Sequence, residues 1–109
     1  QFGPTLVRDS KPQKDVKKQG RSPRCILGYY QPGHYCLIII DGRQKGYSIG
    51  MNFDEMKELC TRMGLKEAYN LDGGHCSFMV KDGVVVSHPY KPTKDVSDGI
   101  LICEGKVGA

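Results

Sequence analysis

Apolar and polar residues alternate along the chain in a pattern that predicts several short strands and one helix. Apolar stretches predict strands at residues 4–8, 25–30, 34–40, 66–71 and 100–103. A Pro-Gly turn at residues 31–33 separates the second stretch from the third and indicates a hairpin. A second hairpin is expected around Asp82-Gly83, because an Asp-Gly pair between apolar runs is a strong hairpin signal. Together these features predict an α+β fold with a mixed, mostly antiparallel sheet.

The longest apolar run, Cys36-Leu37-Ile38-Ile39-Ile40, has no polar residue in alternate positions. A run of this kind is typical of a strand that is covered on both faces. It is also far shorter than the roughly 18 apolar residues that a membrane-spanning helix needs. We therefore expect a buried strand here and no membrane span.

A helix is predicted over about residues 52–63. Asn52 is a good N-cap, and Glu55 stands at the third helical position, where it completes a capping box. Gly64 follows the last turn, where glycine commonly ends a helix. The apolar residues fall on one face at helical spacing: Phe53, Met56, Leu59, Cys60 and Met63.

Composition places the chain among small soluble globular domains. It has 109 residues, of which 39% are hydrophobic and 26% charged. The five cysteines form no C-x-x-C pair, so neither a disulfide scaffold nor a zinc site is expected. Three of them lie in apolar runs and are expected in the core: Cys36, Cys60 and Cys103.

Positive charge is concentrated near the start of the chain. Residues 8–24 carry seven Lys or Arg and two Asp, or +5, which leaves −1 elsewhere in a chain of net charge +4. A basic stretch can bind nucleic acid, but no aromatic residue interrupts this one to stack on bases. We therefore interpret residues 9–23 as a mobile, solvated basic loop and expect no nucleic-acid partner.

Two polar loops follow apolar strands and are candidates for chemistry. The first contains Asp41, Gly42 and Arg43, with Ser48 a few residues on. An Arg side chain offers a planar set of donors that suits phosphate or carboxylate. A surface turn with a salt-bridged Arg explains the same residues equally well.

The second loop runs from Asn70 through Leu71 and Asp72 to the pair Gly73-Gly74, and continues with His75, Cys76 and Ser77. Adjacent glycines let the backbone approach a ligand, and their amides can face an anion. Asp72 can act as a base, nucleophile or metal ligand, Asn70 can orient a sugar hydroxyl, and Ser77 can donate to a phosphate oxygen. His75 can titrate near neutral pH. A tight turn capped by Asp72 is the alternative.

Taken in order, these segments resemble the phosphodiester glycosidase family. The resemblance rests on five short motifs, each weak alone, that occur in the family's order over nearly the whole chain: Phe2-Gly3-Pro4, Pro23-Arg24 with Gly28, Asp41-Gly42-Arg43, Ser48-x-Gly50 before the helix, and Asn70-Leu71-Asp72-Gly73-Gly74. The sequence departs from the family pattern where His75 and Cys76 replace a third Gly and a Ser.

The resemblance implies hydrolysis of a sugar-1-phosphodiester. Arg43 and the Gly73-Gly74 amides would hold the phosphate, and Asp72, with Asp41, would supply the carboxylates. Ser48, Asn70, His75 and Ser77 would complete the substrate site. The replacements at His75 and Cys76 leave a non-catalytic glycan-binding or envelope sugar-phosphate-binding domain as the alternative function.

The resemblance also bears on the partners and placement of the chain. It implies a sugar-phosphate or polysaccharide substrate, no cofactor, and an extracellular or cell-envelope location, and it leaves a divalent cation near Asp72 open. Family domains are longer than this chain, so residues 1–109 are expected to form the C-terminal portion of a larger domain. The missing N-terminal half, or a swapped partner chain, would then cover exposed strand edges.

Overall fold

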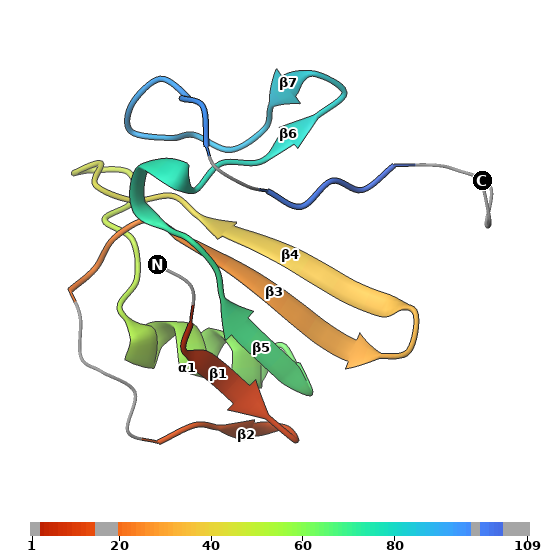
Figure 1. Cartoon of the computed structure of the whole chain (residues 1–109). Coiled ribbons are helices and arrows are strands. Elements are labelled where there is room, and N and C mark those ends of the chain that lie inside the picture. Colours follow the sequence, from red (N-terminus) through yellow and green to blue (C-terminus); the bar gives the residue numbers. More distant parts are fainter. Residues whose placement is uncertain (1–2, 15–19, 97–98, 104–109) are drawn as a thin grey trace.

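The structure, a computed structural model, describes residues 3–14, 20–96 and 99–103 and has a main sheet with one helix packed against it (Figure 1). The sheet has five strands in the order β2-β1-β5-β3-β4. Their bounds are β1 Thr5–Arg8, β2 Lys11–Pro12, β3 Arg24–Gln31, β4 His34–Ile40 and β5 Glu67–Asn70, and the helix α1 spans Phe53–Arg62. A 3₁₀ turn at Gly74–Cys76 and a small hairpin, β6 Val80–Lys81 with β7 Val84–Val85, follow. Every strand pair among the described residues is antiparallel, which confirms the predicted α+β fold.

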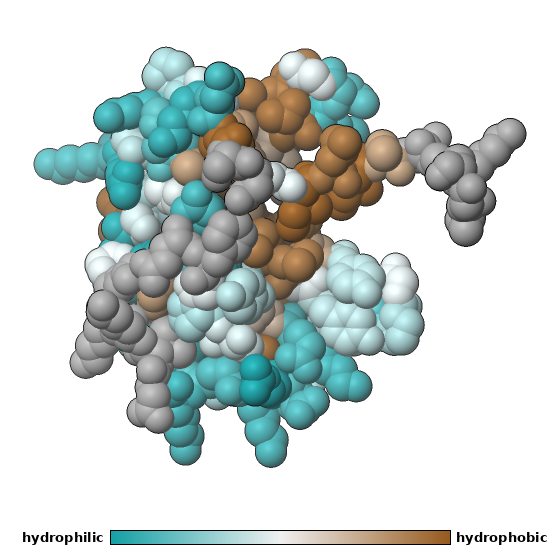
Figure 2. Space-filling view, viewed as in Figure 1, coloured by the Kyte–Doolittle hydropathy of each residue, from teal (hydrophilic) through white to brown (hydrophobic). Residues whose placement is uncertain are grey.

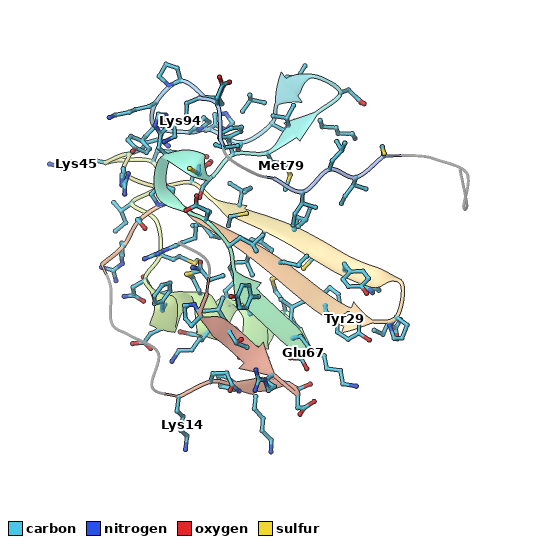
Figure 3. All side chains as sticks on the ribbon, viewed as in Figure 1. Lys14, Tyr29, Lys45, Glu67, Met79 and Lys94 are labelled. Atoms are coloured by element: carbon cyan, nitrogen blue, oxygen red, sulfur yellow. The ribbon has the colours of Figure 1, made fainter. Side chains whose placement is uncertain are left out.

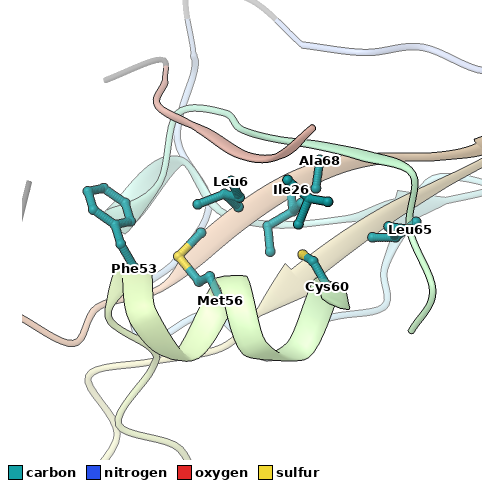
Figure 4. Packing of buried hydrophobic residues seen from close by; sticks show 8 residues of the cluster. Leu6, Ile26, Phe53, Met56, Cys60, Leu65 and Ala68 are labelled. Carbon is teal, nitrogen blue, oxygen red and sulfur yellow. The ribbon is translucent and has the colours of Figure 1, made fainter. Parts of the chain in front are cut away.

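The core lies between α1 and one face of the sheet (Figure 4). It contains Leu6, Val7, Ile26, Phe53, Met56, Cys60, Leu65 and Ala68. The predicted capping box holds the start of α1, because the Glu55 amide donates to Asn52 Oδ1 at 2.9 Å and the Asn52 amide donates to Glu55 Oε1 at 3.0 Å. These two bonds satisfy backbone donors that the first helical turn leaves unpaired. The helix, its cap and most of its apolar face are therefore confirmed.

The β4 strand differs from the expectation that both of its faces would be buried. Cys36 and Ile38 pack against the core, so Leu37 and Ile39, which alternate with them, lie on the face away from α1. The strand stands at the end of the strand order, and its apolar residues are only half-buried. An uninterrupted apolar run predicted two buried faces, whereas residues 36–40 are only half-buried on both faces of the strand.

The expected strand at residues 100–103 is wrong. These residues have no regular secondary structure, and Ile100, Leu101 and Ile102 are exposed. Figure 2 shows apolar residues gathered over this segment and the β6–β7 hairpin. Cys103 is also exposed and so does not belong to the core, while Cys60 is fully buried and Cys36 packs beside it. Apolar sequence alone predicted a strand that has no partner here.

The basic loop predicted at residues 9–23 is ordered at both of its ends. Lys11 and Pro12 form β2, which pairs with β1, and Ser22 makes an isolated bridge with Met51. Residues 15–19 lie outside the described part of the chain. Within the described ranges, none of the helices is long and apolar enough to cross a membrane.

Met56 and Met63 provide a test of the core. Met56 is fully buried under the sheet, whereas Met63, at the C-terminal end of the same helix, is 38% exposed. Met56→Ala is expected to lower the free energy of unfolding by about 2–5 kcal/mol, because it removes buried apolar contacts and leaves a cavity. Urea denaturation measures this change, and Met63→Ala is the control, with an expected change of less than about 1 kcal/mol. Equal effects of the two substitutions would contradict the assignment of the core.

Candidate functional site

The two polar loops singled out in the sequence lie at the same end of the sheet. Both β4 and β5 pair antiparallel with β3, so they run in the same direction on either side of it. The loop after Ile40 and the loop after Asn70 therefore leave the sheet beside the start of β3. In Figure 3, Lys45 and Lys94 lie at this end of the molecule, whereas Glu67 and Tyr29 lie toward the opposite end.

In the first loop, the Asp41 carboxylate is held by neighbouring donors. The Tyr47 hydroxyl donates to it at 2.7 Å, and the His88 amide donates to its two oxygens at 3.1 and 3.2 Å. The Ser48 hydroxyl donates to the Asp41 main-chain carbonyl at 2.6 Å. Asp41 and Ser48 thus stabilise the loop itself in this structure, and a direct contact of either residue with a substrate stays a prediction.

The glycine pair of the second loop packs directly on the segment that enters β3. The Gly74 amide donates to the Pro23 carbonyl at 2.9 Å. A Cβ at Gly73 would lie 2.8 Å from the same oxygen, closer than real Cβ atoms come. Glycine is therefore required at position 73 for close packing within the protein. The expectation that the Gly74 amide faces an anion is wrong for this conformation, because Pro23 already accepts its hydrogen bond.

Arg43 brings the two loops into contact. Its Nη2 atom lies 3.4 Å from the position that a Cβ on Gly74 would take. The guanidinium donates to the Tyr90 hydroxyl and lies 5.0 Å from the centre of the Tyr90 ring. Arg43 is exposed and has a φ of 56°, in the left-handed region that non-glycine residues seldom occupy. The structure therefore places a solvent-facing cation against the Asp-Gly-Gly turn.

Asn70 and Ser77 are less accessible than the sequence indicated. The Asn70 side-chain amide donates to the Gly3 carbonyl at 2.8 Å and is buried where β5 ends. Ser77 is only 2% exposed. Among the described residues, Asn70 Oδ1 and Ser77 Oγ have no hydrogen-bond partner. Both side chains are buried in this structure, and the sugar and phosphate contacts expected of them stay a prediction.

Asp72 lies beside two thiols. Burial, with a smaller contribution from a hydrogen bond to Asp72, raises the pKa of Cys76. Burial, and then the charge of Asp72, also raise the pKa of Cys25. A raised pKa keeps a thiol protonated and hence a poor nucleophile, in keeping with the interpretation of Cys76 as a non-catalytic residue. Across the described ranges, no group of three or more His, Cys, Asp or Glu side chains could hold a metal ion.

Residues 88–92 complete this end of the molecule, and the sequence pattern did not identify them as part of the site. Besides the contacts of His88 and Tyr90 described above, the Pro92 carbonyl lies 2.8 Å from His75 Nε2. The His75 ring also lies 5.8 Å from the Tyr90 ring. A His-Pro-Tyr-Lys-Pro segment is an ordinary loop by composition, so only its contacts place it at the site.

Arg24, which the sequence pattern also did not identify as a functional candidate, binds main-chain carbonyls beside the two loops. It is 6% exposed, and its guanidinium donates to the carbonyls of Met51 at 2.9 Å and Gly20 at 2.7 Å. It also lies 4.6 Å from the centre of the Phe53 ring. Burial, and then the positive charge of Arg43, lower the pKa of Arg24. Arg24 therefore fastens the segments before β3 and before α1, and adds positive charge near Arg43.

The sequence matches the phosphodiester glycosidase family over residues 1–103. Among curated proteins, it is 31% identical over 74 residues to the N-acetylglucosamine-1-phosphodiester alpha-N-acetylglucosaminidase of Bos taurus. That match covers 68% of this chain and 14% of the bovine protein. The chain therefore spans about one seventh of the curated relative that it matches.

Two of the solved structures that match this chain show the shared fold. A Burkholderia pseudomallei protein, described as exported, is 38% identical with a TM-score of 0.60, over 65% of this chain and 14% of its own. The zebrafish N-acetylglucosamine-1-phosphodiester alpha-N-acetylglucosaminidase catalytic domain, auto-inhibited by its pro-peptide, has a TM-score of 0.66 at 20% identity. That second match covers 85% of this chain and 35% of the zebrafish chain, and it shows similarity of fold alone.

The close packing of Gly73 can be tested by adding one methyl group. Gly73→Ala is expected to lower the free energy of unfolding by about 1–3 kcal/mol, because its Cβ would meet the Pro23 carbonyl. Urea denaturation measures the change. The control is Gly20→Ala, where a Cβ would have no neighbour within 4 Å. A Gly73→Ala protein as stable as the control would show that the loop does not pack on Pro23.

Proposed function

This chain belongs to the phosphodiester glycosidase family, and from that membership we propose that the end of the sheet formed by its two polar loops hydrolyses a sugar-1-phosphodiester. The observation that carries the proposal is the position of the Arg43 guanidinium against Gly74, two residues after Asp72. A cation from the first loop thereby contacts the turn of the second loop that carries Asp72. The chain matches only 14% of the length of the bovine relative. The activity of the whole protein is therefore part of the proposal.

The proposed reaction separates the sugar from the phosphate at the anomeric carbon. Arg43 binds the phosphodiester anion and stabilises the negative charge that grows on the phosphate as the bond to the sugar breaks. Asp72 provides the carboxylate, either by taking a proton from the attacking water or by bonding to the anomeric carbon before water replaces it. Water supplies the new sugar hydroxyl, and its other proton goes to the phosphate.

The proposal gives the two aspartates different roles. The Asp41 carboxylate accepts hydrogen bonds from Tyr47 and from the His88 amide, both of which belong to the surrounding loops. We assign it to holding the loop that carries Arg43. We assign Asp72 as the catalytic carboxylate because it stands in the turn that Arg43 contacts, and His75 to the rim of the substrate site.

The second candidate function is binding of a glycan or an envelope sugar-phosphate without turnover. It is favoured by His75 and Cys76 at the end of the Asp-Gly-Gly motif, and by the use of the Gly74 amide within the protein. The two functions differ in one measurable respect. A binding domain would retain a sugar-phosphate polymer unchanged, whereas the enzyme would release free sugar from it.

Activity against an N-acetylglucosamine-1-phosphodiester, the compound class in the bovine relative's name, tests the proposed function. Arg43→Ala is expected to lower kcat/KM by about 10²–10³-fold, because it removes the donors that stabilise the leaving phosphate. Asp72→Asn is expected to lower it by at least about 10²-fold, because an amide cannot act as a base or nucleophile. The assay measures the sugar that the naturally produced protein, or each of its variants, releases from this substrate.

Each variant has a matched control in the same chain. Arg62→Ala removes an exposed Arg that is ion-paired with Glu58 on α1. Asp82→Asn alters an exposed Asp-Gly turn between β6 and β7, where Asn is equally well tolerated. Both controls are expected to keep full activity. If Arg43→Ala and Asp72→Asn also kept it, the proposed site would be wrong.

We also propose that the outer edge of β4 and its face away from α1 pack against further polypeptide. The candidates are the remainder of the family domain or a swapped copy of this chain. An edge strand with apolar side chains and unpaired backbone groups is a favourable surface for such pairing. Support comes from the half-buried Leu37 and Ile39 and from the share of the zebrafish catalytic domain, 35%, that this chain matches.

Self-association of the 109-residue chain tests this surface. The double substitution Leu37→Lys and Ile39→Lys is expected to shift the chain toward monomer in analytical ultracentrifugation, because two charges on an apolar face oppose its burial. Val84→Lys, on the exposed β6–β7 hairpin, is the control for added charge. A chain that stays monomeric at high concentration without any substitution would reject the swapped copy and leave the remainder of the family domain as the proposed partner of this surface.

Placement outside the cytoplasm completes the proposed function. The Burkholderia pseudomallei relative is described as exported, and it is 38% identical to this chain. A protein that acts on envelope or secreted sugar-phosphates would meet its substrate there. This location follows from relatives rather than from a feature of the described residues.

A further inference from the structure

The segment of residues 88–92 contacts candidate site residues in both loops at once. Its His88 amide donates to the Asp41 carboxylate, and its Tyr90 hydroxyl accepts from Arg43. Its Pro92 carbonyl lies within hydrogen-bond distance of His75 Nε2. One five-residue stretch of the same chain therefore engages Arg43 and His75, which are proposed to face a substrate, and Asp41, which holds the loop that carries Arg43.

The contact with Arg43 has the chemistry of the proposed ligand. A hydroxyl oxygen takes a hydrogen bond from the guanidinium, as an oxygen of a phosphodiester would. The Tyr90 ring lies 5.0 Å from the guanidinium carbon and adds a cation–π contact. The acceptor of this hydrogen bond, the Tyr90 hydroxyl, is neutral. A neutral acceptor binds a guanidinium more weakly than an anion does.

The hydrogen bonds that hold the 88–92 segment, including one from the Gln44 side chain to the His88 carbonyl, are exposed. The segment has no regular secondary structure, and it lies at the surface, with His88 and Lys91 exposed. Pro89 and Pro92 have no backbone N–H, so they cannot join a strand ladder. Segments with exposed hydrogen bonds and few buried contacts are the ones that open at the lowest cost in free energy.

We propose that residues 88–92 form a displaceable strap that closes the anion site, with the Tyr90 hydroxyl standing in for a phosphate oxygen on Arg43. A phosphate group binds Arg43 by releasing Tyr90, and the strap then moves away from Asp41 and His75. The inference rests on the anion site of the proposed function. It does not depend on turnover, because it concerns binding of the anion alone.

The Tyr90→Phe variant separates this role from simple packing. Phenylalanine keeps the ring over Arg43 and removes only the competing hydroxyl. A single hydrogen bond of this kind accounts for a change of about twofold to tenfold in a binding constant. Tyr90→Phe is therefore expected to bind inorganic phosphate and dimethyl phosphate about twofold to tenfold more tightly than the unmodified protein, as measured by calorimetry.

Hydrogen exchange supplies a second measurement on the protein as it is naturally produced. Bound phosphate is expected to speed exchange at the His88 amide, because the strap leaves Asp41 when the anion arrives. Tyr35→Phe is the matched control, since Tyr35 is 61% exposed and lies in the β3–β4 hairpin at the other end of the sheet. Its phosphate affinity and exchange are expected to equal those of the unmodified protein.

Weaker phosphate binding by Tyr90→Phe would overturn the proposal, because Tyr90 would then be orienting Arg43 for the anion. Slower exchange at His88 on binding would overturn it too, since the segment would be closing on the ligand. Absence of phosphate binding to Tyr90→Phe would have the same consequence. Tighter phosphate binding without any glycosidase turnover would support the strap and reject only the proposed reaction.

Discussion

Pairing of β3 with a strand on each side is the constraint on which the rest of this structure depends. Because β4 and β5 are both antiparallel to β3, they end at the same edge of the sheet. Ile26, near the start of β3, is fully buried and pairs with Ile38 on one side and Asn70 on the other. A slip of one residue in either pairing would turn the apolar side chains away from α1 and separate the two polar loops. The pairing of β3 with β4 and β5 therefore positions both the apolar core and the two polar loops.

Close packing of backbone on backbone then sets the shape of the site. The Gly73-Gly74 turn lies against the Pro23 carbonyl, and Arg24 holds the neighbouring segments through the Met51 and Gly20 carbonyls. A buried guanidinium bonded to main-chain oxygens stiffens the residues that it joins. Arg43, by contrast, is exposed and contacts the surface segment that carries Tyr90. The site therefore combines a rigid base with groups that can exchange partners.

Local signals predicted the parts of this fold that depend on nearby residues. The capping box of Asn52 and Glu55, the stop at Gly64, and the turn at Asp82-Gly83 are each contained within a few residues, and each was found where the sequence placed it. The errors arose where a distant partner decides the outcome. Residues 100–103 are apolar but have no strand beside them, and β4 has a neighbouring strand at one edge alone. Apolar character shows that a residue favours burial, but not whether the chain covers it.

The sequence by itself determined most of the element types, the helix with its cap, the two polar loops and the family to which the chain belongs. Tertiary structure alone decided which polar groups are accessible. Asn70 and Ser77 point inward, Asp41 is held by Tyr47 and His88, and Arg43 remains at the surface beside Gly74. The physical reason is that hydrogen-bond partners of these groups come from residues far apart in the chain, and no local pattern records such pairings. A sequence motif identifies the polar side chains that could bind or react with a ligand, whereas tertiary packing determines which of them a ligand can reach.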